Sequence, residues 1–582
     1  MLHGRLCVGA ALGKVGGYFR PGPSMRQLLR LTSITCLALA ALPLQATTLL
    51  VNARIHTMDP ARPEASALAW KEDGRLLAVG DTADLKKQYP DANVEDAKGA
   101  TVIPGLIDAH GHMLGLGMTH IQVNLMGSAS RAEVVSRLKA AEAKFPKGTW
   151  LVGYGWDQNR WTDKQFPGAA DLDAAFPDRP VYLDRVDGHA AWVNTAAMKQ
   201  ATKALDGDWQ PEGGRIVRAG KKATGVLIDG AKALVEKSIP PLTHEQTRDA
   251  YKAAFADAVA AGLTGVHDPG VSLEDFKVLQ ELAAAGEIPL RLYEMANGNH
   301  EALEWLCGQG GHWADASGRL QMRTVKLYMD GALGSRGAAL LADYSDDHGN
   351  RGIFVTSPEA YRTAVEKAYR CHVQVATHAI GDRGNRQVLD TYQAVLGDHA
   401  DSNHRWRVEH AQIVALDDIP RFASLHLIAS MQPTHATSDM PWAEQRLGPE
   451  RLKGAYAWQR FIQDKVPLAF GSDFPVEQVN PMLGLYAAVT RQDLNGQPPG
   501  GWLPDQRVSR IQALAGFTRG AAYASFMEDQ VGALKPGMRA DFVVLSADLM
   551  TVPSRQIADL KPLSTWVDGK AVYRAEKTNA TP

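Results

Sequence analysis

Short apolar runs alternate with amphipathic stretches along the middle of this chain, and this alternation restricts its fold more than any other feature. Each run is short enough to be a buried parallel strand. Between most of them lie helix-like stretches such as 273–286 and 357–370, with apolar residues repeating every three to four positions. The runs span residues 101–110, 263–268, 289–295, 323–330, 372–378, 405–410, 427–433 and 466–473. Eight strands that alternate with helices predict an α/β fold, a (β/α)8 TIM-like barrel.

Strand-rich segments flank this middle region on both sides. The run 48–59 near the start and the run 540–546 near the end are apolar and bounded by polar or glycine-containing turns. Both ends of the chain therefore predict one small β-sandwich domain, built from residues 47–103 together with residues 530–582.

A long insertion separates the first predicted barrel strand from the second. Residues 113–260 are rich in Trp, Gly and Asp. Because the insertion follows the end of the first strand, we expect it over the mouth of the barrel, as a subdomain that walls or covers the site. The barrel with this insertion is predicted to span residues 104–529.

Length and charge limit the classes of protein to consider. The chain has 582 residues, so one large domain with accessory pieces is expected. A net charge of −2 gives no electrostatic reason to expect nucleic acid or an anionic membrane as a partner. A small-molecule substrate is the expected partner, and a homodimer is expected only because such assemblies are common.

The N-terminal segment resembles a secretory signal. Arg26 and Arg30 precede an apolar run over 31–44, and Leu44-Gln45-Ala46 fits a cleavage site. The run is short for a membrane span, although an N-terminal anchor helix is the alternative. Residues 1–46 are therefore predicted to be an upstream extension (1–24) followed by a signal peptide. The mature protein is expected to be exported, periplasmic or secreted, without a membrane anchor.

Two of the four cysteines lie outside this segment. Cys307 and Cys371 could pair in an oxidising compartment. Two cysteines do not make a disulfide framework, however, and two buried thiols are the favoured interpretation.

Polar residues follow the predicted barrel strands where active-site residues of such barrels lie. Each histidine alone is more simply a hydrogen-bonded structural residue. Imidazoles and carboxylates that converge suit Zn²⁺ or a similar divalent ion, with an open position for water. Alternate strand residues point the same way, so His110 and His112 suit one metal. The residues at the strand ends are Asp108, His110, His112, His267, Asp268, Glu294, Lys326, Asp330, His378, Glu409, His410, Gln432, His435 and Asp473.

Lys326 does not fit a simple ligand set. A lysine ammonium cannot bind a cation. One interpretation is a buried stem with its charged head near Asp330. The other requires a neutral amine that carbon dioxide carboxylates, giving an oxygen ligand that can bridge two metals.

Five motifs together resemble the amidohydrolase superfamily, and more narrowly its YtcJ-like metal-dependent hydrolases (amidohydrolase family 3). Segments 185–194, 262–270 and 532–546 also fit that group. The five motifs are PGLIDAHGH (104–112), VKLYMDGALGSRGA (325–338), VATHAIGDRGN (375–385), RVEHAQ (407–412) and GSDFPVE (471–477).

The resemblance implies a ligand set and a reaction. The implied metal ligands are His110, His112, Lys326 as a carboxylated lysine, His378, His410 and Asp473, around one or two ions, most simply zinc. It implies hydrolysis by a metal-activated water, with Asp473 as catalytic proton shuttle. His189 or His435 could donate to the developing oxyanion, and a purely structural role is the equal alternative for each. Trp156 could wall the substrate pocket, although simple packing within the insertion is slightly favoured, and Arg336 could bind a substrate carboxylate.

Three functions stay open at this stage. The leading one is an exported, metal-dependent hydrolase of carbon–nitrogen bonds other than peptide bonds, most simply of an amide. It is favoured because every ligand position that the family uses is filled. The second keeps the metal but cleaves an ester, a lactone or a cyclic amidine. The third is a regulatory or binding protein on the same scaffold, because fold does not fix function.

Overall fold

The computed structural model describes residues 47–298 and 300–576. The predicted upstream extension and signal peptide, residues 1–46, lie outside the described residues. Within the described ranges, no helix is both long and apolar enough to cross a membrane.

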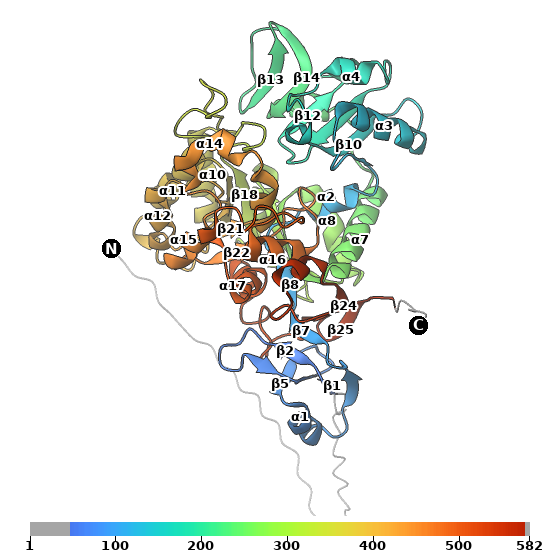
Figure 1. The fold of residues 1–582 in the computed structure, drawn as a ribbon, viewed down its shortest axis with the longest axis vertical. Helices are drawn as coiled ribbons and strands as arrows, with labels where there is room; N and C mark the ends of the chain where they lie inside the picture. Colours follow the sequence, from blue (N-terminus) through green and yellow to red (C-terminus); the bar gives the residue numbers. More distant parts are fainter. Residues whose placement is uncertain (1–46, 299, 577–582) are drawn as a thin grey trace, which may run out of the picture. The chain divides into compact units, whose positions relative to one another are not determined.

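Eight parallel strands form the centre of the molecule in the order β8, β15, β16, β18, β19, β20, β21, β22 (Figure 1). Between the outermost two, the Ala109 N–H donates to the Phe470 carbonyl and the Asp473 N–H to the His110 carbonyl, so the barrel is nearly closed. The predicted (β/α)8 TIM-like barrel is confirmed. The strands are β8 (Leu106–Asp108), β15 (Leu263–Val271), β16 (Arg291–Asn297), β18 (Leu320–Tyr328), β19 (Gln374–Ala379), β20 (Arg407–His410), β21 (Ile428–Met431) and β22 (Leu468–Phe470).

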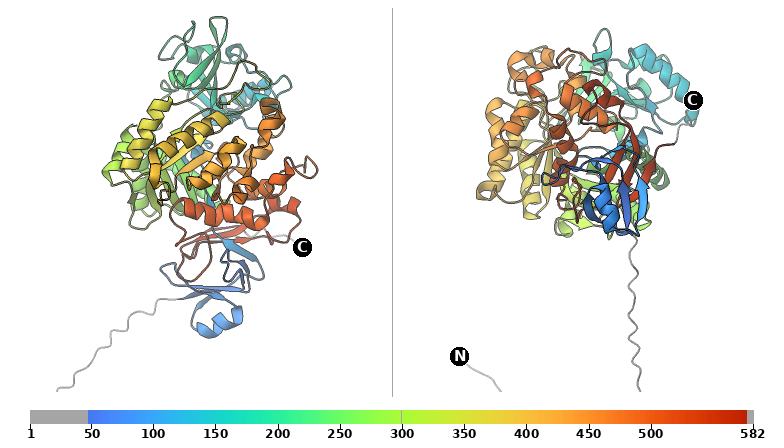
Figure 2. Two further views of the ribbon diagram at one scale, coloured as in Figure 1. Left: turned by 90° about the vertical axis from the view of Figure 1, so that its left-hand side faces the viewer. Right: turned by 60° about the horizontal axis from the view of Figure 1, so that its bottom comes forward.

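Helices alternate with these strands and lie around them (Figure 2). Their starts follow local chemistry: the side chains of Thr243, Ser272 and Ser357 each accept a backbone N–H of the first turn. The longer helices are α7 (His244–Ala260), α8 (Leu273–Ala284), α9 (His300–Gly308), α10 (Pro358–Arg370), α11 (Asp382–Leu396), α14 (Ala443–Leu452) and α16 (Pro481–Thr490). The shorter ones are α2 (Met113–Met118), α12 (Ile419–Ser424), α13 (Pro433–Asp439), α15 (Trp458–Gln463), α17 (Arg510–Ala515) and α18 (Ala521–Ala524).

Two further sheets come from the ends of the described chain. One has the order β5, β4, β1, β6 and the other β25, β24, β23, β7, β2, β3, so strands from both ends share the second sheet. Strand β7 runs on into barrel strand β8 with only Gly105 between them. The N-terminal elements are β1 (Thr48–Val51), β2 (Arg54–His56), β3 (Glu64–Ala65), β4 (Ala67–Trp70), β5 (Leu76–Gly80), α1 (Thr82–Gln88), β6 (Asn93–Asp96) and β7 (Thr101–Pro104). The C-terminal strands are β23 (Phe542–Leu545), β24 (Pro562–Val567) and β25 (Lys570–Arg574).

The segment after the first barrel strand builds its own sheet, in the order β13, β14, β12, β11, β10, β9. It has a core of its own, in which Trp156, Trp161 and Trp192 pack together. Its elements are β9 (Val123–Asn124), α3 (Arg131–Ala141), β10 (Leu151–Trp156), α4 (Ala169–Asp173), β11 (Val181–Arg185), β12 (Ala190–Val193), α5 (Thr195–Met198), β13 (Gly214–Ala219), β14 (Lys222–Asp229) and α6 (Ala233–Glu236).

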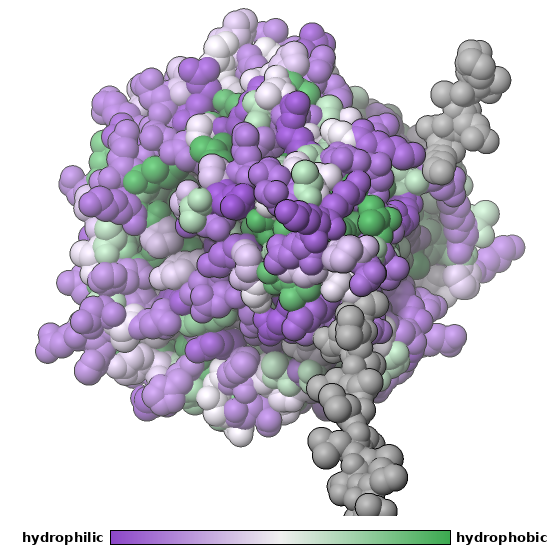
Figure 3. Space-filling view, turned by 90° about the horizontal axis from the view of Figure 1, so that it is seen from below, coloured by the Kyte–Doolittle hydropathy of each residue, from purple (hydrophilic) through white to green (hydrophobic). Residues whose placement is uncertain are grey.

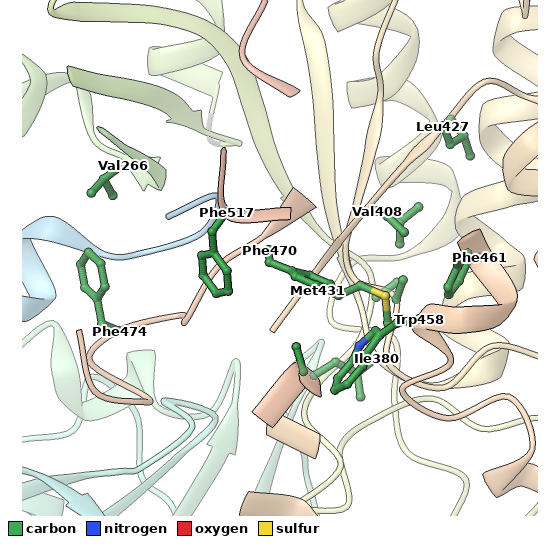
Figure 4. Close-up of a cluster of buried hydrophobic side chains, with 14 of the residues drawn as sticks. Val266, Ile380, Val408, Leu427, Met431, Trp458, Phe461, Phe470, Phe474 and Phe517 are labelled. Atoms are coloured by element: carbon green, nitrogen blue, oxygen red, sulfur yellow. The ribbon is translucent and has the colours of Figure 1, made fainter. Parts of the chain in front are cut away.

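The largest hydrophobic core lies between the barrel and its helices (Figure 4). Phe470 of β22 contacts Trp458 and Phe517, with ring centroids 5.9 Å apart in each pair. This packing holds the last strand in place just before Asp473. On the face in Figure 3, hydrophobic residues form only small groups among hydrophilic ones.

Cys307 and Cys371 form a disulfide, so the expectation of two buried thiols was wrong. The two residues lie at the end of α9 and just after α10, and their Cα atoms are 5.1 Å apart. The pairing depends on how two helices pack, which their spacing in the sequence does not reveal.

We expect loss of this disulfide to destabilise the fold. It closes a loop over a sequence separation of 64 residues, and such bonds typically contribute about 2–4 kcal/mol. A Cys307→Ser/Cys371→Ser variant should unfold at lower urea concentration than the wild type, with activity retained in buffer. Dithiothreitol should lower the wild-type midpoint and leave that of the variant unchanged; equal midpoints without dithiothreitol would contradict the expectation.

Candidate metal centre

The carboxyl ends of the barrel strands bring the predicted ligands to one cavity of about 1320 Å³. His110 follows β8, and His112 precedes α2. Lys326 and His378 lie near the ends of β18 and β19. The cavity is lined by His110, His112, Lys326, His378, His410 and Asp473, together with His189 and His435.

His110, His410 and Asp473 form a group that could hold a metal ion, with donor atoms within 4.8 Å of one another. His110 Nε2 lies 3.6 Å and His112 Nε2 3.2 Å from the same oxygen of Asp473. His410 and Asp473 have φ values of +71° and +63°. Non-glycine residues in this left-handed region cost about 1–3 kcal/mol and cluster at functional sites.

His378 extends this group on the side of β19. Its ring centroid is 4.6 Å from that of His410, and its side chain is 3% exposed. Its Nε2 atom is buried and has no hydrogen-bond partner among the described residues. An unpartnered buried nitrogen is costly in an apolar interior, and a metal ion at this point would satisfy it.

The protonation states suit a cation. Burial lowers the pKa of His110 to about 4 and, with the neighbouring imidazoles, lowers the pKa of His378 and His410 well below the ordinary value. Burial alone would raise the pKa of Asp473, but the His112 hydrogen bond and the surrounding histidines hold it well below its usual range. Neutral imidazoles and an ionised carboxylate are the forms that bind divalent metals.

Residues behind the ligands fix their orientation. The His110 Nδ1–H donates to Glu409 Oε2 at 2.5 Å, and Arg407 pairs with Glu409 at 2.6 Å. His410 Nδ1 lies 2.9 Å from Gln432 Oε1. Such partners fix the tautomer of a ligating histidine. In the sequence, Glu409 and Gln432 were identified only as residues at strand ends. The position of Glu409 next to His410 was the one available signal of its orienting role.

Two buried aspartates fasten the strand ends without lying among the candidate ligands. Asp108 accepts the His110 N–H and both the N–H and the hydroxyl of Ser472, which joins the first strand to the last. Asp330 accepts the N–H groups of Ala339, Ile380 and Gly381, just after His378. Burial raises the pKa of each carboxyl to about 7.

Lys326 points into the ligand group rather than toward Asp330. Its Nζ lies 3.2 Å from His110 Nε2, and the residue is 1% exposed. Burial lowers the pKa of the ammonium to about 8. The amine is therefore much closer to its neutral form at physiological pH than an exposed lysine is.

Two further histidines face the cavity from outside the strand ends. His435 in α13 has its Nε2 3.6 Å from Asp473 Oδ2. His189 comes from the insertion, and its ring centroid is 5.0 Å from that of His378. The His189 Nδ1–H donates to Asp229 Oδ1 at 2.6 Å. Burial alone would lower the pKa of His189, but Asp229 raises it above its ordinary value.

The structure does not bring Trp156 or Arg336 into this group. Trp156 is fully buried in the core of the insertion, and its indole N–H donates to the Leu183 carbonyl. Arg336 pairs with Asp346 at 2.9 Å. Neither Trp156 nor Arg336 is among the described residues that line the cavity. The structure therefore gives neither assignment to substrate binding any support: the Trp156 side chain packs in a core, and the Arg336 side chain already has a partner.

A parallel eight-stranded barrel with histidines and an aspartate at its carboxyl end is an arrangement typical of metal-dependent hydrolases. Comparison with known proteins agrees. The model of the Amidohydrolase family matches residues 93–573. The chain therefore belongs to the amidohydrolase family, and the resemblance drawn from its motifs is confirmed.

Individual relatives share most of the chain. It is 33% identical over 532 residues to the putative amidohydrolase YtcJ of Bacillus subtilis (strain 168). This alignment covers 89% of this chain and 98% of that protein. It is 26% identical to the N-substituted formamide deformylase of Arthrobacter pascens, and this alignment covers 91% of this chain and 99% of the relative. A solved structure of an uncharacterized metal-dependent hydrolase from Pyrococcus horikoshii OT3 has a TM-score of 0.72 at 29% identity, covering 88% and 99%.

Proposed function

We propose that this protein hydrolyses an amide-type carbon–nitrogen bond of a small molecule with the help of bound zinc. The observation that carries the proposal is the buried group of neutral imidazoles around the ionised Asp473, on the wall of a large cavity. A relative named as an N-substituted formamide deformylase supports the choice of an amide over an ester or a lactone.

The residues that would hold the metal are His110, His112, His378, His410 and Asp473. When bound there, a divalent ion supplies Lewis-acid chemistry, which activates water and polarises the scissile carbonyl. Asp473 is ionised, so it could accept a proton from the attacking water and pass it to the leaving nitrogen. His435 and His189 face the same space and can donate to the carbonyl oxygen as negative charge develops on it.

Metal removal tests this proposal. Dialysis against a chelator should abolish turnover in a screen of N-substituted formamides, N-acyl amino acids, dipeptides and esters, and Zn²⁺ should restore it. Metal analysis should find one or two equivalents of metal in the active protein. Purified protein without stoichiometric metal, or full activity after chelation, would overturn the proposal, and faster turnover of esters than of amides would overturn the choice of bond.

We further propose that Lys326 is carboxylated and serves as a ligand. Its burial, its lowered pKa and its 3.2 Å distance from His110 support this. A Lys326→Ala variant should lose about one metal equivalent if the carbamate bridges two ions, together with most turnover. Growth of the wild type with ¹³C-bicarbonate should add a carbamate carbon signal that the variant lacks. Unchanged metal content and turnover would remove Lys326 from the site.

Export to an oxidising compartment is also proposed. The disulfide between Cys307 and Cys371 supports it, because such bonds persist in secreted and periplasmic proteins. The signal-like pattern before residue 47 points the same way. Fractionation of cells that express the full chain, with sequencing of the mature N-terminus, tests this; uncleaved protein in the cytosol would contradict it.

A further inference from the structure

The insertion contributes His189 to the cavity, and Asp229 of the same insertion lies behind this histidine. The His189 Nδ1–H donates to Asp229 Oδ1 at 2.6 Å, and the Asp229 backbone N–H donates to the His189 carbonyl at 2.9 Å. The pair is therefore joined twice, once through side chains and once through the backbone. With Nδ1 engaged, Nε2 is the nitrogen that remains for a substrate.

The Asp229 carboxylate lies in an unfavourable, buried environment. Its side chain is 1% exposed, and its second oxygen, Oδ2, has no hydrogen-bond partner within the described ranges. Its φ of +49° lies in the left-handed region, which non-glycine residues adopt rarely. A buried carboxylate with one imidazole as its side-chain partner adds little to packing. The unpartnered buried oxygen, rather than the backbone conformation, points to a functional role.

The loop after barrel strand β18 leaves room for this carboxylate. A Cβ on Gly331 or on Gly337 would lie 2.6 Å or 2.7 Å from Asp229 Oδ2. Neither glycine has a positive φ, so an alanine would fit the backbone, and the closest contact that opposes it is with Asp229. The glycines of this motif therefore provide space for a residue of the insertion.

We propose that Asp229 is a positioning residue for the hydrolysis: it holds His189 beside His378 so that Nε2 faces the reacting carbonyl, and Gly331 and Gly337 form the socket that accepts Asp229. His189 is then the donor that acts on the substrate, and the insertion completes the active site rather than only covering it. This inference rests on the proposed function.

A double-mutant cycle tests the pairing in the metal-loaded full chain, using the amide that the wild type turns over fastest. Asp229→Asn should lower kcat about 10–100-fold, with KM and metal content unchanged. His189→Ala should lower kcat by about 10²–10³-fold, as loss of one oxyanion donor does. Asp229→Asn should have no further effect in the His189→Ala background. Full activity of Asp229→Asn, or an equal loss in both backgrounds, would overturn the proposal.

The socket gives a second test that does not depend on turnover. Gly331→Ala should lower the thermal midpoint, and this loss should shrink in an Asp229→Ala background because the clash is gone. Gly308→Ala is the matched control, because a Cβ there meets nothing within 4 Å. A Gly331→Ala variant as stable as Gly308→Ala would contradict the role of Gly331 in making room for Asp229.

A crystal structure of Asp229→Ala tests the positioning role. The His189 ring should have left its position beside His378; an unmoved ring would overturn that role. If the wild type turns over no amide, the proposed function fails, while these two measurements still decide the inference.

Discussion

An Asp473→Asn variant is expected to lose about 10⁴-fold in kcat, the upper end of what one general acid–base group contributes. Asparagine keeps the size of the side chain and one oxygen, but it neither takes up nor releases a proton near neutral pH. Since His112 and His110 both approach the same Asp473 oxygen, at 3.2 Å and 3.6 Å, the change should leave the histidines in place. We expect KM and the fold to be retained, as measured by steady-state kinetics and circular dichroism.

Asp275→Asn is the matched control for this variant. Asp275 lines the same cavity, but its carboxylate interacts with Ser272 at the start of α8, away from the candidate ligands. Its substitution should leave kcat within about twofold of the wild type, as for a residue that makes no contact with the reacting atoms. If Asp473→Asn keeps about a tenth of wild-type kcat with normal metal content, Asp473 is not the proton shuttle.

Glu409→Gln should weaken both metal binding and the fold. Glutamine can still accept the His110 N–H, but it leaves Arg407 buried without the charge that now neutralises it at 2.6 Å. Breaking a buried ion pair from one side costs about 3–5 kcal/mol of unfolding free energy. Loss of such an orienting partner typically lowers metal affinity or activity about 10–100-fold. Urea denaturation of the metal-free protein and competition with a zinc chelator measure the two effects.

The stability difference should persist over the neutral and mildly acidic range. Burial alone would raise the pKa of Glu409, but Arg407 and His110 hold it well below its ordinary value. A carboxyl whose pKa is depressed in the folded state stabilises the fold above its unfolded-state pKa and loses this effect only as the pH falls through the depressed value. Glu528→Gln is the control: its partner Arg405 lies 2.6 Å away, but the Glu528 side chain is 34% exposed, and the expected cost is about 0–1 kcal/mol. Equal losses in the two variants would contradict the role assigned to Glu409.

The barrel and most of its site could be predicted from sequence because each signal is local. A strand is a short apolar run, and the residue that follows it lies at the mouth of the barrel whatever the details of packing. His110, His378 and His410 were found in this way. Predicting these histidines required no knowledge of which distant residues they contact.

Most features that could not be predicted from the sequence depend on contacts between segments far apart in the chain. Cys307 and Cys371 pair because the C-terminal ends of α9 and α10 meet, and Trp156 belongs to a core that only the folded insertion creates. Asp229 lies 40 residues beyond His189 and meets it only because β12 and β14 are neighbours in one sheet. No periodicity or strand-end rule reports such a pairing.

The seam of the barrel has a consequence for assembly of the site. Asp108 and Ser472, 364 residues apart in the chain, are joined by a 2.7 Å hydrogen bond where the first and last strands meet. His110 stands on one side of this seam and Asp473 on the other. An ion held by both residues would add a further link across a seam that hydrogen bonds already close, so that metal binding would stabilise the closed barrel as well as supply the site.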